Sequence, residues 1–206
     1  MKIVRLSRTA STQDVARDLA VGTVVVADEQ TVGRGRRDRR WEAPPGTALL
    51  ASFVLPARSL ASLAAGVATA VACGPEVRLK WPNDLLAEGR KLAGILVERR
   101  AEHCVVGIGV NLSWAPPGAA RLGVSRDELL QELISQLSRW FGATDAVVLQ
   151  AWRARSATLG QMVRVELTDG VLEGVAEDID ADGALIVAGR RIVAGDVVHL
   201  RPTPPG

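Results

Sequence analysis

The chain has 206 residues, of which 48% are hydrophobic and 23% charged, a composition that supports a sizeable core and excludes a disordered chain. The formal net charge is +2, so affinity for a nucleic acid or a membrane would need a local patch of charge. No apolar run reaches the roughly 18 residues of a membrane-spanning helix, and the N-terminus lacks the apolar segment of a signal peptide. We therefore expect no membrane partner.

Two cysteines, Cys73 and Cys104, lie in apolar surroundings without the spacing of metal ligands. We expect buried free thiols, which are typical of a reducing compartment, and therefore a cytoplasmic location. With only two histidines in the chain, these residues cannot build a usual zinc site, and the sequence predicts no metal ligands.

The first 159 residues mix strand and helix patterns. Strands are expected at residues 2–6, 23–27, 47–55, 77–80, 91–99 and 104–112. Helices are expected after an N-cap at Ser11 and at residues 59–73, 125–141 and 145–157. Because strands and helices do not alternate strictly, the pattern favours the α+β class.

After Gly160 the sequence changes to short strand-like runs separated by turn signals. The strands are expected at residues 162–167, 172–179, 184–187, 191–193 and 197–200. The turn signals are Asp169-Gly170, Asp182-Gly183, Gly189 and Gly195-Asp196. Short strands of this kind predict a small barrel. We therefore predict two domains, residues 1–159 and 160–206.

The strongest local signal is residues 33–41, Gly-Arg-Gly-Arg-Arg-Asp-Arg-Arg-Trp, in which five arginines fall within seven residues. Like charges about 8 Å apart in water repel by roughly 0.5 kcal/mol, so an anion or an acidic partner should relieve the crowding. Arginine forks match carboxylate and phosphate oxygens, and glycines let the backbone approach a ligand closely. Trp41 is suited to stacking on a flat ring. For this segment alone, a solvated basic loop that contacts RNA is an equal alternative.

A second signal is Lys80-Trp81-Pro82-Asn83-Asp84, followed by an apolar strand that Lys91 begins. Only three lysines occur in the chain, and two of them lie in this stretch. The Lys91 ammonium is expected at the end of its strand, where it can bridge two anionic oxygens. The alternative is a strand-end lysine that only contacts water.

A third signal is Gly107-Ile108-Gly109-Val110-Asn111. The two glycines lie on one face of a strand and leave a flat backbone floor for a ligand. The amide of Asn111 offers a donor and an acceptor that suit a nucleobase edge. Close packing of a helix on the strand is the alternative.

Together these segments resemble the biotin protein ligase family, whose motifs occur here in the family's order. The matching residues are Ser11-Thr12-Gln13, Gln30, residues 33–36, Trp41, residues 80–84, residues 91–96 and residues 107–111. The chain departs from the family pattern at Gln13, where asparagine is common, and at Asp38, which interrupts the basic run. Only ten residues precede Ser11, too few for the DNA-binding domain of bifunctional members, so we expect no DNA binding.

The resemblance implies a mixed sheet packed with helices, the class II synthetase-like catalytic domain of biotin ligases, followed by a small SH3-like barrel. It implies ATP-dependent activation of biotin to biotinoyl-5′-AMP, with Mg²⁺ arriving on ATP. Biotin would then pass to a lysine of a biotin carboxyl carrier protein. Monomer and homodimer both remain open.

The resemblance also implies the site residues. Lys91 and Arg36 would be catalytic. Biotin would bind to Ser11, Thr12, Gln13, Gln30, Gly33, Arg34, Gly35, Arg36 and Lys91. ATP would bind to Arg36, Arg39, Trp41, Asn83, Asp84, Lys91, Gly107, Gly109 and Asn111. Asp84 would orient either Mg²⁺ or the incoming lysine, and the sequence does not choose between these roles.

Two rival functions remain at this stage. A lipoate or octanoate ligase would share the general fold and the strand-borne lysine, but these enzymes lack the pairing of the 33–36 and 80–84 motifs. A nucleic-acid-binding module that uses Arg34 to Arg40 would leave Lys91 and Asn111 unexplained.

Overall fold

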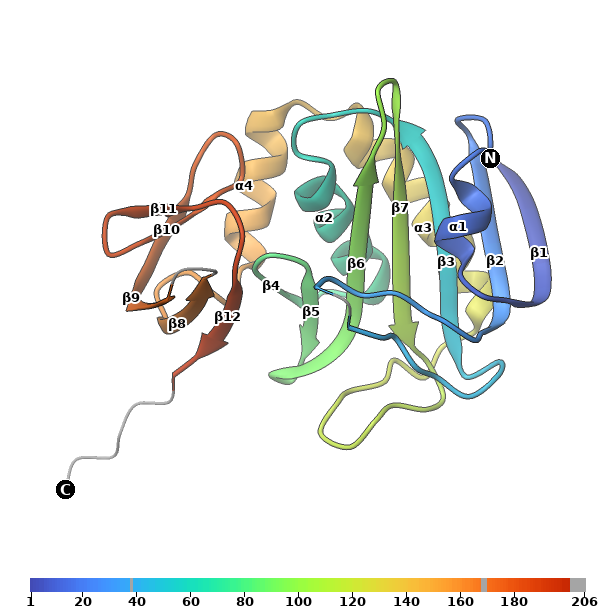
Figure 1. The fold of residues 1–206 in the computed structure, drawn as a ribbon, viewed down its shortest axis with the longest axis horizontal. Helices are drawn as coiled ribbons and strands as arrows, with labels where there is room; N and C mark the ends of the chain where they lie inside the picture. Colours follow the sequence, from blue (N-terminus) through green and yellow to red (C-terminus); the bar gives the residue numbers. More distant parts are fainter. Residues whose placement is uncertain (38, 168–169, 201–206) are drawn as a thin grey trace.

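The computed structural model describes residues 1–37, 39–167 and 170–200. Its larger part is built on the strands β1 (Lys2–Thr9), β2 (Thr23–Gln30), β3 (Ala48–Pro56), β4 (Arg78–Lys80), β5 (Asp84–Ala87), β6 (Arg90–Arg99) and β7 (His103–Asn111). They form one sheet in the order β1-β2-β3-β7-β6-β5-β4 (Figure 1). Strands β1 and β2 run parallel, and all other neighbours are antiparallel. The predicted α+β class with a mixed sheet is confirmed.

Strand β5 was not expected from the sequence, which predicted no strand between residues 80 and 91. The strand has four residues, too few for a recognisable alternation. It forms because Leu85 and Leu86 are both buried between β4 and β6. Asp84 thereby becomes the first residue of a strand that pairs with β6, opposite Gly94.

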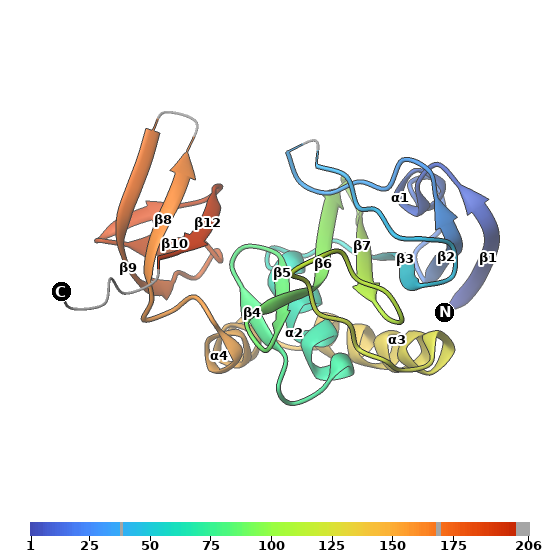
Figure 2. The ribbon, with the colours of Figure 1, turned by 90° about the horizontal axis from the view of Figure 1, so that it is seen from below.

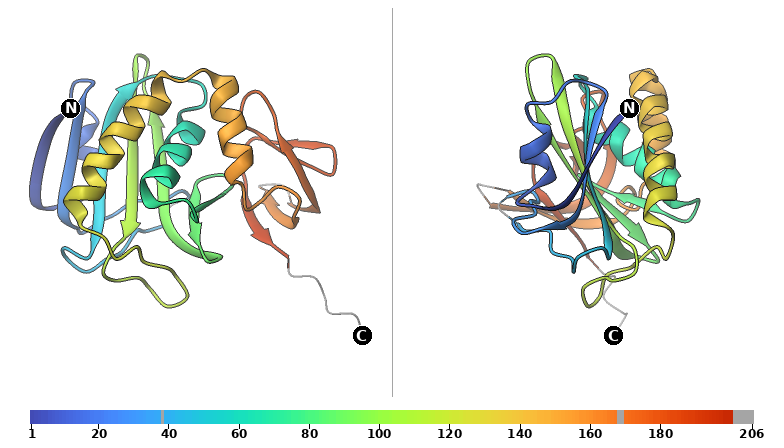
Figure 3. Two further views of the ribbon diagram at one scale, coloured as in Figure 1. Left: turned by 180° about the vertical axis from the view of Figure 1, so that it is seen from behind. Right: turned by 90° about the vertical axis from the view of Figure 1, so that its right-hand side faces the viewer.

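The described helices are α1 (Thr12–Ala16), α2 (Ala61–Cys73), α3 (Arg126–Gly142) and α4 (Asp145–Arg155). Figure 3 shows α2 and α3 on one face of the sheet and α1 on the opposite face. The expected N-cap at Ser11 is confirmed, since its Oγ accepts a hydrogen bond from the Gln13 N–H at 3.3 Å. The cap fixes the first turn of α1, and with it Thr12 and Gln13, against the sheet.

The sheet is buried on both faces because its strands alternate between two cores. In β2, Val24 and Val26 join the main core under α2 and α3, whereas Val25 joins a smaller core under α1. Helix α2 consists mostly of alanine and small residues and is buried nearly all round. Helix α3 is amphipathic and buries a leucine stripe that includes Leu133.

The C-terminal part contains β8 (Met162–Leu167), β9 (Gly170–Ile179), β10 (Leu185–Val187), β11 (Arg190–Ile192) and β12 (Asp196–His199). The five predicted strands are thus all present, in an antiparallel sheet of order β11-β10-β9-β8-β12. Of the predicted turn Asp169-Gly170, Asp169 lies outside the described residues. The two sheets lie on either side of residue 160, and the division into domains at that point stays a prediction.

The sequence predicted a small barrel, and its five strands are present, but they do not close, because the described strands β11 and β12 at the two ends of this sheet do not pair with each other. These strands have only three and four residues, and β12 uses its backbone to pair with β8. The result is an open sheet whose β8 and β12 side faces the larger part of the molecule (Figure 2).

Trp81 joins the two sheets. Its indole Nε1 donates to the Gly183 carbonyl at 3.1 Å, and its backbone N–H donates to the Thr158 hydroxyl at 3.0 Å. Both Trp81 and Thr158 are buried. The segment that follows Trp81 is therefore held at the junction of the two sheets.

None of the described helices has the length and hydrophobicity needed to span a lipid bilayer.

Replacing Thr158 with valine should lower the free energy of unfolding by about 1–3 kcal/mol, because the buried Trp81 N–H loses its acceptor. Urea denaturation measures this change. The exposed Thr31 offers a matched control, and Thr31→Val should stay within about 0.5 kcal/mol of the original protein. Equal stabilities of the two variants would contradict the assignment of Thr158 as a structural acceptor.

Candidate active site

A cavity of about 380 Å³ opens at the junction of the two sheets. It is lined by all of the predicted site residues except Gly33 and Asn111. These lining residues are Ser11, Thr12, Gln13, Gln30, Arg34, Gly35, Arg36, Arg39, Trp41, Asn83, Asp84, Lys91, Gly107 and Gly109. Residues separated by nearly a hundred positions in the chain therefore meet in one place.

One end of the cavity is a connected polar cluster beneath α1. The backbone N–H and hydroxyl of Thr12 both donate to Gln30 Oε1, at 2.7 and 2.9 Å. Ser52 Oγ donates to Gln13 Oε1 at 3.0 Å and lies 2.8 Å from Thr12 Oγ1. Gln13 Nε2 in turn donates to the Val105 carbonyl at 3.0 Å. These side chains are mutually fixed, which preorganises the cluster for a polar ligand.

Ser52 was missed by the sequence analysis. It is fully buried in the middle of β3, between apolar neighbours. A single serine in an apolar strand gives no recognisable signal, since only the packing of α1 on β3 reveals its partners.

The glycine floor predicted on β7 is present, and Trp41 and Gln13 lie directly on it. A Cβ atom on Gly109 would come within 2.6 Å of the Trp41 ring atom Cε2, and one on Gly107 would come within 2.6 Å of Gln13 Oε1. Gly94 on the neighbouring strand β6 also approaches the Trp41 ring. The glycines are thus explained by close contact with these two side chains.

Lys91 is the second residue of β6, and its side chain reaches Asp84 on the neighbouring strand β5. Its Nζ is 2.7 Å from Asp84 Oδ1 and 5.9 Å from the centre of the Trp41 ring. Lys80, which was not predicted as a site residue although it belongs to the 80–84 motif, also lines the cavity. Burial is the main reason that the pKa of Lys80 is lowered, while Asp84 raises it and Lys91 lowers it further. Asp84 therefore forms an ion pair with Lys91 and also stabilises the charged form of Lys80.

The segment 33–41, named here the arginine loop, reaches from β2 across β7 and β6 toward the C-terminal sheet (Figure 2). At the base of the loop, the Trp41 N–H donates to the Gly33 carbonyl at 3.0 Å. Gly33 itself is not among the residues that line the cavity. Arg36 is half-buried and its Nη1 donates to Asn83 Oδ1 at 3.4 Å. Burial is the main cause that lowers the pKa of Arg36, and Asp196 acts in the opposite direction.

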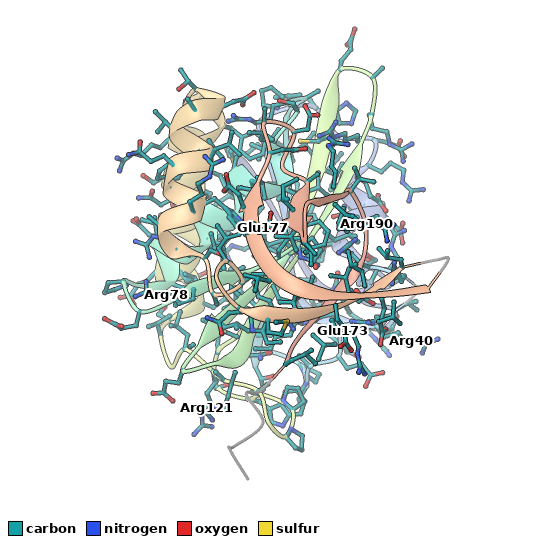
Figure 4. The ribbon with its side chains drawn as sticks, turned by 90° about the vertical axis from the view of Figure 1, so that its left-hand side faces the viewer. Arg40, Arg78, Arg121, Glu173, Glu177 and Arg190 are labelled. Atoms are coloured by element: carbon teal, nitrogen blue, oxygen red, sulfur yellow. The ribbon has the colours of Figure 1, made fainter. Side chains whose placement is uncertain are left out.

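The protein's own carboxylates relieve the crowding of positive charge in the loop. Arg34 pairs with Asp14 at 2.6 Å and with Glu98 at 3.2 Å. Arg37 and Arg39 pair with Asp196 on β12. Arg40 also lines the cavity, and Figure 4 shows it at the periphery of the molecule. Asp38 lies outside the described residues.

Asn111 is not in the cavity wall, contrary to the expectation that its amide faces a nucleobase. It is buried at the end of β7, where Nδ2 donates to the Ala120 carbonyl at 2.9 Å and lies 3.5 Å from the Lys91 carbonyl. The amide therefore ties the following segment to the backbone that carries Lys91. The spacing of the motif could not reveal this, because the partner at Ala120 depends on how the chain returns after β7.

The C-terminal sheet contributes cavity residues that the sequence analysis did not identify. They are Glu166, Asp196, Val197 and Val198. Asp196 follows a glycine at an ordinary turn signal, so nothing in the local sequence distinguishes it. Among the described residues, no group of three or more His, Cys, Asp or Glu could hold a metal ion.

Comparison with known proteins agrees with both sheets. The model of the biotin/lipoate A/B protein ligase family matches residues 3–111, and the model of the biotin protein ligase C-terminal domain matches residues 158–200. The biotin–(acetyl-CoA-carboxylase) ligase of Mycobacterium tuberculosis is 40% identical, covering 95% of this chain and 84% of its own length. The ligase of the same name from Paracoccus denitrificans is 37% identical, covering 91% and 96%.

Among solved structures, the biotin protein ligase from Aquifex aeolicus in complex with biotin and ATP has the same fold. The TM-score is 0.83 at 24% identity, and the likeness covers 97% of this chain and 99% of that one. The two family matches and the two relatives named as ligases show that the chain is an enzyme of the ligase class. The chain belongs to the biotin protein ligase family, as the sequence motifs indicated.

Gly109→Ala should displace the Trp41 ring, because the added methyl would overlap Cε2. The fraction of tryptophan fluorescence that acrylamide quenches should rise in this variant, and the rise should vanish in a Trp41→Phe background. Gly142→Ala is the control, since a Cβ there meets open space. Unchanged quenching in Gly109→Ala would show that the ring does not depend on the glycine floor.

Proposed function

We propose that this chain activates biotin with ATP to form biotinoyl-5′-AMP and then transfers biotin to a lysine of a biotin carboxyl carrier domain. The observation that carries the proposal is that Lys91 and Arg36 line one cavity with the polar cluster under α1. Two relatives that cover most of this chain carry the name biotin–(acetyl-CoA-carboxylase) ligase, which supports the acceptor class.

The chemistry explains why the cavity is rich in cations. The carboxylate of biotin is ionised near neutral pH, so it needs no general base before it attacks the α-phosphate. The obstacle is that an anion must approach a polyanion. Positioning and charge neutralisation therefore dominate the barrier, and Lys91 and Arg36 supply both.

In the first step, a carboxylate oxygen of biotin bonds to the α-phosphorus of ATP, and the bond to the β-phosphate breaks to release pyrophosphate. Lys91 bridges the carboxylate and the α-phosphate, and Arg36 holds the phosphate that stays. In the second step, the acceptor amine bonds to the carbonyl carbon, AMP leaves and the nitrogen loses a proton. Asp84, which already pairs with Lys91, is the carboxylate that orients the incoming amine.

The polar cluster supports a place for the ureido ring of biotin. Thr12, Gln13, Gln30 and Ser52 form an interlinked set of donors and acceptors under α1, and Ser11 lies beside them. The backbone of Arg34 and Gly35 covers the biotin end of the cavity. Gly33 contributes indirectly, because its carbonyl accepts the Trp41 N–H at the base of the arginine loop.

The nucleotide occupies the other end of the cavity. Trp41, lying on Gly109, offers a flat face to adenine, whereas Gly107 lies against Gln13. Asn83 holds Arg36 toward the phosphates. Arg39 lines the cavity at the nucleotide end. Asn111 acts indirectly, because its amide hydrogen-bonds to the backbone carbonyl of Lys91.

Mg²⁺ enters with ATP and neutralises phosphate charge. This cation is held mainly by phosphate and water ligands and needs only one or two carboxylates from a protein.

We propose that the protein works in the cytoplasm, where ATP is available. Both cysteines are buried free thiols whose pKa is raised by burial, to about 12 for Cys73 and about 11 for Cys104, so they stay protonated and unreactive.

A lipoate or octanoate ligase is the alternative, since the matching family includes lipoate ligases. The C-terminal match to biotin protein ligases favours biotin. A linear acyl chain would also make no use of the polar cluster, because it offers no donor or acceptor there.

The whole reaction gives the direct test. The protein with biotin, ATP and Mg²⁺ should release pyrophosphate, and an added carrier fragment should gain the mass of one biotinoyl group. Octanoate in place of biotin should support neither. Activity with octanoate alone would assign the chain to the rival class.

Lys91→Gln should slow pyrophosphate release about 100-fold or more, because the ammonium stabilises charge that develops in the transition state. Lys2→Gln, at an exposed lysine on β1, is the matched control and should retain full activity. Circular dichroism should show both variants folded. Near-normal pyrophosphate release by Lys91→Gln would remove Lys91 from its role.

A further inference from the structure

One carboxylate of the C-terminal sheet holds two arginines of the arginine loop. Asp196, at the start of β12, pairs with Arg39 and lies 3.3 Å from Arg37 Nη1. Its side chain is only 17% exposed, although both arginines are more accessible. The Arg37 guanidinium also reaches the Glu166 carbonyl at 3.5 Å. Because Glu166 pairs directly with Asp196 between β8 and β12, the two acceptors form one site.

The backbone of the loop supports the importance of this contact. Arg37 has a φ of +52°, in the left-handed region that residues with a side chain rarely adopt. Such a conformation persists only where surrounding contacts impose it. Among the described residues, the Arg37 side chain hydrogen-bonds to Asp196 and to the Glu166 carbonyl.

The ion pairs of the arginine loop anchor its two ends. Arg34 is held at the other end by Asp14 and Glu98, which belong to the larger part of the molecule. Between the two anchored ends lies Arg36. Within the described part of the chain it forms no ion pair and contacts the Asn83 amide. The anchors thus leave the Arg36 guanidinium available to a ligand inside the cavity.

We propose that Asp196 is a positioning residue: by pairing with Arg37 and Arg39 it holds the arginine loop over the cavity, so that Arg36 faces the phosphate and water is kept from the activated intermediate. This inference rests on the proposed ligase function and assigns Arg39 as an anchor of the loop. It gives the C-terminal sheet a direct part in the reaction, although none of its groups touches the reacting atoms.

The first test needs no ligand. Amide hydrogen exchange of residues 33–41 in the full chain should be about three- to fivefold faster in Asp196→Asn, the range expected for the loss of an ion pair at a partly exposed site. Asp178→Asn is the matched control, because Asp178 lies on β9 of the same sheet and pairs with Arg153 of α4 rather than with the loop. Its loop exchange should equal that of the original protein. Equal exchange in Asp196→Asn would overturn the proposal.

A double-mutant cycle separates this contact from a general effect on the sheet. Arg37→Gln should also speed loop exchange. The double variant should exchange more slowly than the product of the two single factors, because the variants share the Arg37–Asp196 pair. Factors that multiply fully would mean that the two residues act independently, which would also overturn the proposal.

The consequence for the reaction is measured as the ratio of pyrophosphate released to biotin transferred. In Asp196→Asn this ratio should rise several-fold, because the intermediate is hydrolysed or lost before transfer. A purely structural role for Asp196 would lower both quantities together and leave the ratio unchanged, and that result would overturn the proposal. If the original protein releases no pyrophosphate, the proposed function fails, whereas the exchange measurements still decide whether Asp196 holds the loop.

Discussion

The structure depends on gathering several cations around one cavity without letting their repulsion open it. Arginines and lysines this close together repel one another, and burial adds a desolvation cost that lowers the pKa of Arg36 and Lys80. Carboxylates from separate elements offset this cost. Asp14 comes from α1, Asp84 from β5 and Asp196 from β12, and each pairs with a different cation. The fold therefore brings acids and bases together from distant parts of the chain.

Close packing determines the shape of the uncharged part of the site. Trp41 fits against the sheet only because Gly94 and Gly109 present bare backbone, and Gln13 fits only because Gly107 does. The polar cluster under α1 needs a hydroxyl at Ser52 inside an otherwise apolar strand. Small residues in the strands thus create the shape of the cavity, and larger side chains from the loop and α1 fill its walls.

The 80–84 segment connects the two halves of the molecule. Trp81 is anchored to Gly183 in the C-terminal part and to Thr158 just before it, and the next residues place Asn83 and Asp84 in the cavity wall. The C-terminal sheet is consequently held where β8 and β12 complete the cavity wall. This explains physically why a site built mostly from the larger sheet also uses a carboxylate from the smaller one.

The sequence by itself determined the α+β class, the strand-rich C-terminal part and most of the cavity residues. Patterns of hydrophobicity repeat locally, and the motifs carry side chains whose chemistry is recognisable in isolation. The tertiary structure alone decided which partners those side chains have. The Asn111 amide donates to the Ala120 carbonyl, and Ser52 belongs to the polar cluster. Strand β5 pairs between β4 and β6, and the described outer strands of the C-terminal sheet do not pair with each other. Each of these outcomes depends on contacts between residues far apart in the chain, which no local pattern encodes.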